Sequence, residues 1–294
     1  MVPLTWTLSG RTALVTGASA GIGAAMVRAL VRAGCRVAAT ARRQDRLDAL
    51  AAELGPERVL AIAGDVAQAA DRARIVDAVR ARFGAIDLLV NNAGFGQRGP
   101  VELVPEADAR HQFDVNVFAL TELTRLVLPD MRRAGRGRIL NVSSVVGRLA
   151  IPMSGWYAAT KHALEALSDA LRMEVAPFGI DVAIIEPGPI LTEFQDVAQE
   201  TLGRLEGDVA AYDRMIRDLH AARKEAMLGW ISADACAAVM LEAAQVPRPR
   251  ARYPITRLAW AMLCARWLLP TRVLDWILSR RLKLPPYGAL RGSA

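Results

Sequence analysis

The sequence predicts an α/β fold, in which one doubly wound parallel sheet carries helices on both faces and is followed by a C-terminal helical extension. Short apolar runs rich in Val, Ile and Leu alternate with longer Ala, Arg and Leu stretches that follow the period of an α-helix. The runs are apolar throughout, which is typical of strands covered on both faces. Strands that alternate with helices are joined by right-handed crossovers, so we expect them to be parallel.

Six apolar runs are expected to form the strands of this sheet. A composition of 53% hydrophobic, 23% charged and only 5% aromatic residues suits such a helix-rich globular chain. The predicted strands cover residues 12–16, 36–40, 59–62, 86–90, 138–142 and 181–185.

A glycine-rich turn follows the first predicted strand directly. The sequence TGASAGIG at 16–23 leads from that strand into a helical run. Glycines at this junction let the backbone turn tightly and approach a pyrophosphate, whose charge the helix N-terminus meets. The strand before and the helix after favour a Rossmann-like dinucleotide site over glycines that serve only a tight turn. We expect dinucleotide contacts from Gly17, Ser19, Gly21, Ile22 and Gly23.

The end of the second predicted strand carries arginines where NAD enzymes usually carry an acid. A carboxylate there binds the ribose hydroxyls and repels a 2′-phosphate, whereas this chain has Arg42 and Arg43. Arg42, with Arg43 and the Ser19 hydroxyl, offers charge and donors suited to a phosphate. These arginines could instead be the solvated start of a helix, but cations there oppose the helix dipole. The sequence therefore favours NADP(H) over NAD(H).

A tyrosine and a lysine one helical turn apart form the candidate catalytic pair. Tyr157 and Lys161 stand at i and i+4 at the start of a predicted helix, which places both side chains on one face. An ammonium so close to a phenol stabilises the phenolate. Ser144 lies just past the predicted strand 138–142, where a doubly wound sheet has its active-site crevice. This order of residues after a glycine-rich turn indicates an active site.

Together these motifs resemble those of the short-chain dehydrogenase/reductase family, and the resemblance extends over residues 10–245. The turn at 16–23 is similar to the family's cofactor turn, and Asn91-Asn92-Ala93-Gly94 to its central-strand motif. The residues that resemble its catalytic tetrad are Asn116, Ser144, Tyr157 and Lys161. The resemblance also implies contacts to the adenine ring from Asp65 and Val66, and to the rest of the cofactor from Asn92, Ala93, Gly94, Tyr157, Lys161, Pro187, Gly188 and Thr192.

The resemblance implies hydride transfer between C4 of a nicotinamide and a carbonyl or carbinol carbon. Tyr157 would deliver or remove the proton on the oxygen, while Lys161 and the positive oxidised nicotinamide lower its pKa. Ser144 would hydrogen-bond the substrate oxygen. Asn116 is similar to the residue that holds a water linking Lys161 to solvent, and a buried amide that satisfies a helix is the alternative.

We expect residues 1–250 to form the dinucleotide-binding catalytic domain, with a substrate loop at about 187–230. That stretch begins with the rigid Pro187-Gly188-Pro189, and the sequence that follows is polar and interrupted by glycines. Such a sequence fits a lid over a pocket, or an ordinary surface insertion. The candidates for lining the substrate side are mostly apolar, so we expect a lipophilic ketone, aldehyde or secondary alcohol. They are Phe95, Val145, Met153, Trp156, Phe194 and Trp230.

The chain continues past the point where short family members end, as a basic amphipathic extension over 251–294. From residue 248 on it has nine arginines and one lysine against a single acid, Asp275. The apolar run at 258–269 is interrupted by Arg266 and is too short to span a bilayer. Residues 255–284 fit an anionic membrane surface, or equally a helical hairpin over the pocket or a subunit interface. Similar extensions occur in members that resemble hydroxysteroid or retinol dehydrogenases.

Partners and location follow from the same composition. The arginines of the extension are interleaved with Trp and Leu rather than grouped into a recognition motif, which argues against nucleic acid. Cys35, Cys236 and Cys264 lack metal-ligand spacing, and the first residues do not resemble a signal peptide. We therefore expect no metal site and a cytoplasmic protein, peripheral to a membrane if the extension binds one. We also expect a homo-oligomer, either a dimer or a tetramer.

Two other functions fit the same motifs. A 3-oxoacyl-thioester reductase would apply the same residues to a different carbonyl. A non-catalytic NADP(H)-binding protein that docks through its basic extension is the alternative outside enzymes, but a pure binder does not need all four tetrad residues. The sequence therefore predicts an NADP(H)-dependent oxidoreductase.

Overall fold

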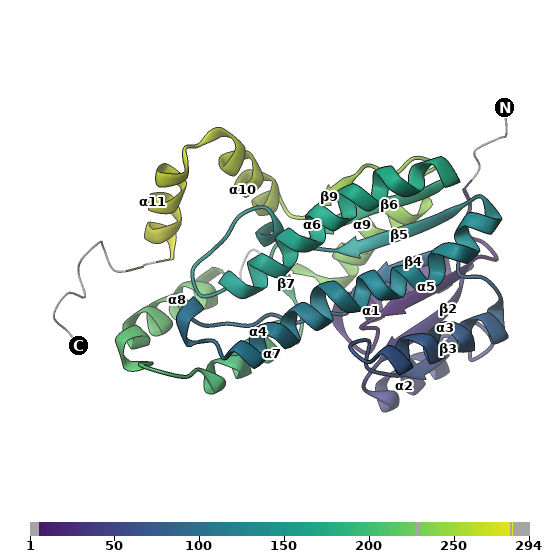
Figure 1. The fold of residues 1–294 in the computed structure, drawn as a ribbon, viewed down its shortest axis with the longest axis horizontal. Helices are drawn as coiled ribbons and strands as arrows, with labels where there is room; N and C mark the ends of the chain where they lie inside the picture. The colour runs from purple at the N-terminus through teal and green to yellow at the C-terminus, as the bar shows by residue number, and fades with distance from the viewer. Residues whose placement is uncertain (1–5, 227–229, 283, 285–294) are drawn as a thin grey trace.

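The computed structural model describes residues 6–226, 230–282 and 284. A seven-stranded sheet in the order β3-β2-β1-β4-β5-β6-β9 forms its centre, and every pair of neighbouring strands is parallel (Figure 1). The strands are β1 (Thr12–Thr16), β2 (Arg36–Ala41), β3 (Val59–Ala63), β4 (Leu88–Asn91), β5 (Gly137–Val142), β6 (Ile180–Glu186) and β9 (Arg252–Pro254). The predicted doubly wound α/β fold is confirmed.

All six predicted strands are present, with bounds within two residues of the prediction. The largest correction is at β4, which begins at Leu88 rather than at Ile86. Just before it, the Asp87 carboxylate accepts a hydrogen bond from the Thr12 amide at 3.1 Å, in the place of a strand carbonyl. The sequence did not predict a separate two-stranded sheet of β7 (Ile190–Leu191) and β8 (Ile231–Ser232).

Each face of the sheet has its own set of helices, because alternate side chains of a strand point to opposite faces. Ala13 and Val15 belong to the core under α1 (Gly21–Arg32), α2 (Gln44–Leu54) and α9 (Ala233–Gln245). Leu14, between them, belongs to the core under α3 (Ala69–Phe83), α5 (Ala119–Ala134) and α6 (Gly155–Val175). The strands are therefore covered on both sides, as their apolar sequences predict.

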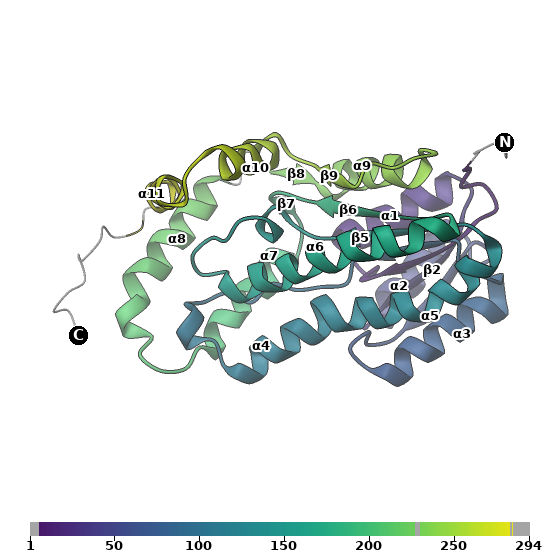
Figure 2. The same ribbon diagram turned by 45° about the horizontal axis from the view of Figure 1, so that its top comes forward.

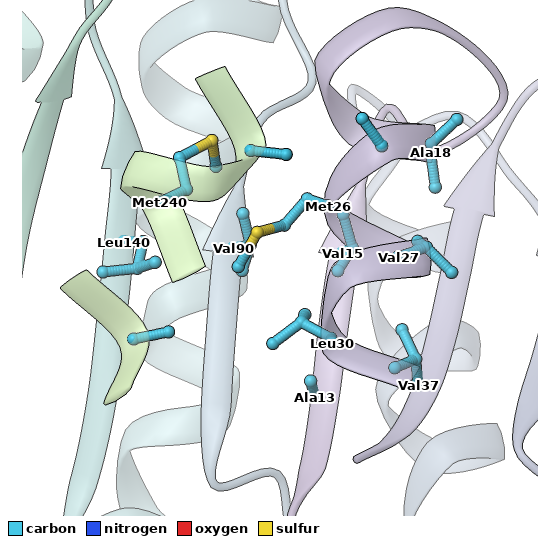
Figure 3. Close-up of a cluster of buried hydrophobic side chains, with 14 of the residues drawn as sticks. Ala13, Val15, Ala18, Met26, Val27, Leu30, Val37, Val90, Leu140 and Met240 are labelled. Atoms are coloured by element: carbon cyan, nitrogen blue, oxygen red, sulfur yellow. The ribbon is translucent and has the colours of Figure 1, made fainter. Parts of the chain in front are cut away.

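Figure 3 shows how α1 and α9 close the first of these cores. Met26 of α1 and Met240 of α9 both extend toward Val90 in the middle of the sheet. All three residues are fully buried. This packing fixes the start of α1, and with it the glycine-rich turn, relative to the strand ends.

The order of the strands predicts where a crevice should lie, beyond the carboxyl ends of β1 and β4 in the middle of the sheet. β1 lies between β2 and β4, so the chain leaves β1 in one direction and β4 in the other. In doubly wound sheets this switch point opens a crevice beyond the carboxyl ends of the two strands. The glycine-rich turn after β1 and the Asn92-Ala93-Gly94 segment after β4 both lie there.

The later elements gather at the end of the sheet toward which the strands point (Figures 1 and 2). They are α4 (Glu106–Phe113), α7 (Phe194–Glu200), α8 (Asp213–Ala226), α10 (Arg257–Leu268) and α11 (Thr271–Arg281). Hydroxyl caps begin two neighbouring helices: Ser232 Oγ accepts from the Ala235 amide, and Thr256 Oγ1 from the Ala259 amide. Among the residues described, the predicted substrate loop at 187–230 is mostly helical. β7, near the start of this loop, pairs with β8, just after its end.

Candidate active site

The turn after β1 leaves no room for side chains at its glycines. A Cβ on Gly23 would lie 2.2 Å from the Gly17 carbonyl oxygen, and a Cβ on Gly17 would lie 2.9 Å from Ala93 Cα. Gly17 and Gly21 also have φ values of +64° and +54°, in the left-handed region that favours glycine. Ile22 lies between two of these glycines in the first turn of α1. This cradle at a helix N-terminus fits the pyrophosphate of a dinucleotide.

The segment after β4 is hydrogen-bonded to this turn. Thr16 Oγ1 accepts hydrogen bonds from the Asn92 and Ala93 amides at 3.0 and 2.9 Å. Asn92 Nδ2 donates to the carbonyl oxygens of Thr16 and Gly17 at 2.9 and 3.2 Å. The structure therefore brings Asn92 and Ala93 against the cofactor turn. Thr16, which makes this connection, was not among the predicted site residues.

A cluster of charges lies at the end of β2, where the coenzyme phosphate is predicted. The Arg42 side chain is exposed, and Arg43 donates to Ser19 Oγ from Nε and Nη2 at 3.2 and 3.0 Å. Glu193 accepts from Arg43 Nη1 at 2.8 Å and from Arg46 Nη1 at 2.5 Å. These two hydrogen bonds lower the pKa of the Glu193 carboxyl. Sequence reasoning missed Arg46 and Glu193.

Asp65 and Val66 follow β3, beside the end of β2. Asp65 Oδ1 accepts a hydrogen bond from the Ala67 amide at 2.9 Å, and the Asp65 amide donates to Asp71 Oδ2 at 2.8 Å. The neighbouring Gly64 amide donates to the Ala41 carbonyl oxygen at the end of β2. Both predicted adenine residues therefore lie at the carboxyl edge of the sheet.

Tyr157 and Lys161 stand on the first turns of α6, as predicted. Lys161 Nζ donates to the Val142 carbonyl oxygen at 2.8 Å and lies 5.8 Å from the centroid of the Tyr157 ring. Burial raises the pKa of Tyr157 to about 12, against a smaller opposite effect of its hydrogen bond with Ser144. Burial lowers the pKa of Lys161 to about 8, against the attraction of Glu165. The phenol is therefore neutral at pH 7, and the amine is charged.

Ser144 connects this pair to the segment after β6. Its Oγ donates to the Pro187 carbonyl oxygen at 3.4 Å, and the Val145 amide donates to the same oxygen at 3.0 Å. A Cβ on Gly188 would lie 2.3 Å from Thr256 Oγ1, so only glycine fits between this segment and the start of α10. The contact with Thr256 was not predicted.

Thr192 lies at the other end of the same segment. A Cβ on Gly21 would be 3.0 Å from Thr192 Cγ2, so the threonine stands against the cofactor turn. The stretch from Pro187 to Thr192 thus runs from the Ser144 hydroxyl to the glycine-rich turn.

Asn116 lies in a π-helical turn, Asp114–Phe118, between α4 and α5. Its Nδ2 donates to the Phe95 carbonyl oxygen at 2.9 Å and to Thr160 Oγ1 at 3.1 Å, and its Oδ1 accepts from the Phe95 amide at 3.1 Å. Both donors are used, whereas an amide oxygen can accept a second bond. A Cβ on Gly94 would lie 2.9 Å from that oxygen and 3.7 Å from Lys161 Nζ. The geometry is compatible with both roles considered for Asn116, which are to hold a water next to Lys161 or to serve as a buried amide that satisfies a helix.

Among the predicted pocket residues, Phe194 packs against the ring of Tyr157, the predicted catalytic tyrosine. The two ring centroids are 5.6 Å apart. Val145 and Met153 are buried, the former directly after Ser144. Trp156 instead packs edge-on against Phe113 and donates to the Val101 carbonyl oxygen.

The remaining two candidates lie in different surroundings. Phe95 packs against the His111 ring at a centroid distance of 5.5 Å. The indole nitrogen of Trp230 is buried, and within the described part of the chain it has no hydrogen-bond partner. The structure thus brings Phe194 to the predicted catalytic tyrosine and Val145 next to Ser144, whereas in the ranges described no contact with these residues is seen for Phe95 or Trp230.

The chain is similar to known proteins over the whole of this site. Residues 11–203 match the family model described as short chain dehydrogenase. The chain is 36% identical over 275 residues to an uncharacterized oxidoreductase of Escherichia coli K12, YbbO, which covers 94% of this chain and 96% of that protein. It is 32% identical over 279 residues to the NADPH-dependent 3-dehydrocapnine reductase of Ornithobacterium rhinotracheale, covering 93% and 98%.

A solved structure is also similar to this chain over nearly its whole length. The short-chain dehydrogenase of Streptomyces avermitilis matches with a TM-score of 0.76 and 34% identity, over 93% of this chain and 96% of that one. Every catalytic and cofactor residue predicted from the sequence falls within the range that the family model matches.

Proposed function

Because this chain belongs to the short-chain dehydrogenase family, we propose that it transfers hydride between NADP(H) and a lipophilic ketone, aldehyde or secondary alcohol. Enzymes of this family are oxidoreductases that act on CH–OH groups with NAD(P). The observation that carries the proposal is that Ser144 and Lys161 both lie close to the Tyr157 phenol. Ser144 acts on the phenol by lowering its pKa against the effect of burial, and the Lys161 ammonium lies 5.8 Å from the ring centroid.

Tyr157 is the residue that we assign to proton transfer. Its pKa of about 12 keeps the phenol protonated at neutral pH, so in the reductive direction it starts as the acid. Ser144 holds the substrate oxygen at the phenol. Lys161, charged below its pKa of about 8, stabilises the phenolate that remains after the proton has left. A bound nicotinamide supplies or accepts the hydride.

The choice of NADP(H) is supported by the charge at the end of β2. Arg42 is exposed there, and Arg43 is already hydrogen-bonded to Ser19 of the glycine-rich turn. Guanidinium groups bind phosphate oxygens in a bidentate manner, whereas a carboxylate at this position would repel them. The name of one relative, an NADPH-dependent reductase of a 3-dehydro compound, agrees with both the coenzyme and a ketone substrate.

The lipophilic substrate is supported by what surrounds Tyr157. Phe194 and Val145 contact the catalytic residues, and Met262 of α10 packs against the same apolar cluster as Tyr157. A pocket lined by such side chains favours an apolar carbonyl compound, for which a steroid or retinoid is a suitable size class.

We place the protein in the cytosol as a homo-oligomer. The thiols of Cys35 and Cys236 are free and buried, as suits a reducing compartment. Phe118, Leu167 and Met173 leave large apolar side chains exposed on and beside α5 and α6, which supports a subunit interface there. Light scattering of the wild type and of Met173→Glu tests this, since a monomeric wild type would contradict it.

The activity is tested with purified protein, by following oxidation of NADPH and of NADH with lipophilic ketones, aldehydes and 3-oxoacyl thioesters. We expect turnover with NADPH on apolar carbonyls, and loss of turnover in Tyr157→Phe with nearly unchanged NADPH binding. Turnover on thioesters alone would assign a 3-oxoacyl-thioester reductase. NADPH binding without turnover on any compound would indicate a non-catalytic binding protein, and a preference for NADH would overturn the coenzyme assignment.

A further inference from the structure

Helices α10 and α11 present large apolar side chains to solvent. Trp267 and Leu268 are 84% and 66% exposed, and Trp276 and Trp260 are 57% and 50% exposed. Soluble proteins rarely leave such side chains next to one another uncovered. The two helices, at the upper left of Figures 1 and 2, lie at the edge of the molecule rather than under another element. Their outer surface therefore needs a partner.

α10 packs against the rest of the protein without using the apolar side chains on its outer side. Its inner side buries Ala259 and Leu263 against Val145, Val146 and Leu149, in the segment that follows Ser144. Among its twelve residues only Arg257 and Arg266 are charged. A helix that is apolar around most of its circumference is normally covered on more than one side.

The same surface is strongly basic. Arg257, Arg266, Arg272, Arg280 and Arg281 are all exposed, and Asp275 is the one acid on the two helices. Within the described ranges none of these five arginines has an ion-pair partner, and Arg280 stacks on the Trp276 ring at 4.6 Å. The partner must therefore combine negative charge with an apolar phase.

These two requirements select one kind of partner. A second copy of the surface would bring the same five positive charges and would be repelled. Nucleic acid supplies phosphates but would leave the leucines and most tryptophan rings in water. The boundary of an anionic bilayer offers phosphates to arginine and an interface in which tryptophan rings are stable. Of the helices described, none is long and apolar enough to cross a bilayer, so contact would be from one side.

We propose that α10 and α11 dock this protein on an anionic lipid surface. Trp260, Trp267, Leu268 and Trp276 enter the boundary between headgroups and acyl chains, and the arginines bind lipid phosphates. The inner side of α10 packs beside Tyr157, so a lipophilic substrate has a short path from the bilayer to the site. This last consequence rests on the proposed function, whereas docking itself does not.

The test is sedimentation of the full chain with vesicles of phosphatidylcholine alone, or of equal parts phosphatidylcholine and phosphatidylglycerol. We expect binding to the anionic vesicles, weakened by salt. Trp267→Ser should lower the partition coefficient at least about tenfold, because it removes the most exposed ring. Phe178→Ser is the matched control, since it removes an exposed ring at the far end of α6.

The charge requirement has its own matched pair. Arg281→Glu should weaken binding to anionic vesicles about three- to tenfold, whereas Arg82→Glu should not. Both arginines are exposed in the last turn of a helix, so the two variants carry the same helix-dipole penalty. Circular dichroism checks that all variants fold.

Several results would overturn docking. The first is equal sedimentation of the wild type and Trp267→Ser with anionic vesicles. The second is binding to neutral vesicles only. The third is a wild type that does not bind vesicles but forms a dimer, which Trp267→Ser dissociates. Tyr157→Phe separates this proposal from the proposed function, because it should bind vesicles as wild type does even though it is inactive.

Discussion

Arg43 and Glu193 form an ion pair of 2.8 Å between the end of β2 and the residue before α7. Arg46 holds the other oxygen of the same carboxylate at 2.5 Å. Arg43 also donates to Ser19 in the cofactor turn. Glu193 therefore occupies guanidinium donors that a coenzyme 2′-phosphate would need, and the segment that enters α7 is tied to that corner.

Removing this carboxylate charge should favour NADPH. We expect Glu193→Gln to tighten NADPH binding about two- to fivefold, because an exposed ion pair competes by up to about 1 kcal/mol. NADH, which has no 2′-phosphate, should bind as before. Titration of tryptophan fluorescence with each coenzyme measures both constants. Glu57→Gln, at an exposed ion pair with Arg58, is the control. An equal change for both coenzymes would show that Glu193 acts on the loop and not on the phosphate.

The pKa values at the catalytic pair predict a pH profile. The Lys161 pKa of about 8 means that its ammonium is present below that pH and is lost above it. Reductive kcat/KM should therefore be level below about pH 8 and fall above it, since the phenolate left by Tyr157 loses its stabilising charge. Lys161→Met should lower kcat/KM at least about a hundredfold and remove the fall near pH 8. A profile that stays level to pH 10 in the wild type would contradict this role.

The parts of the site that lie in contiguous motifs were predictable from sequence. Gly17, Gly21 and Gly23 stand in one turn, and Tyr157 and Lys161 on one helix, so local spacing is enough to define their geometry. Six strands were predicted within two residues because each has a run of buried apolar side chains.

Contacts between distant segments were not predictable in this way. Glu193 and Arg43 form an ion pair although they are 150 positions apart in the sequence. Thr256, just before α10, lies against the distant Gly188. Periodicity reports which face of an element is buried, but not which two loops meet at the edge of a sheet. β7 and β8 have two residues each, too few for any period to show.

A buried carboxylate behind the site should make stability depend on pH. Glu186 is completely buried, and its Oε1 lies 3.6 Å from Arg252 Nε and 3.7 Å from Arg148 Nη1, too far for hydrogen bonds. Burial and the nearby Glu165 raise the pKa of Glu186 to about 7, although Arg148 and Arg252 oppose this. The folded protein therefore binds a proton between pH 4.5 and 7 that the unfolded chain does not.

The sign of the effect follows from that proton. The contribution of Glu186 is fully present below its unfolded pKa and is lost as the pH rises through about 7. From about pH 5 to about pH 8, the free energy of unfolding of the wild type should fall by about 2–3 kcal/mol more than that of Glu186→Gln. Urea unfolding at both pH values measures this. Parallel pH dependence in the two proteins would mean that Glu186 stays ionised in the folded state.

Arg138 should be the most costly single side chain to remove. It is fully buried, and Nη1 donates to the carbonyl oxygens of Ala243, Ala244 and Val246 at 3.1, 2.9 and 2.7 Å. Its Nη2 donates to Asp181 Oδ2 at 2.7 Å. One guanidinium thus donates to the end of α9 and ties it to β5 and β6. Its loss would remove the donor to the Ala243 and Val246 carbonyl oxygens, whereas the Ala244 carbonyl oxygen also accepts from Trp6 Nε1 at 2.6 Å.

We expect Arg138→Met, which keeps the length of the side chain, to lower the free energy of unfolding by about 3–5 kcal/mol, because buried carbonyl oxygens at the end of α9 lose their donor. Arg110→Met breaks an exposed pair with Glu106 and should cost less than about 0.5 kcal/mol. Urea unfolding of both variants tests the difference. Similar costs would show that water can replace the guanidinium at the end of α9. A large difference would mean that this helix end is held by a buried charge, since the apolar packing of α9 is the same in both variants.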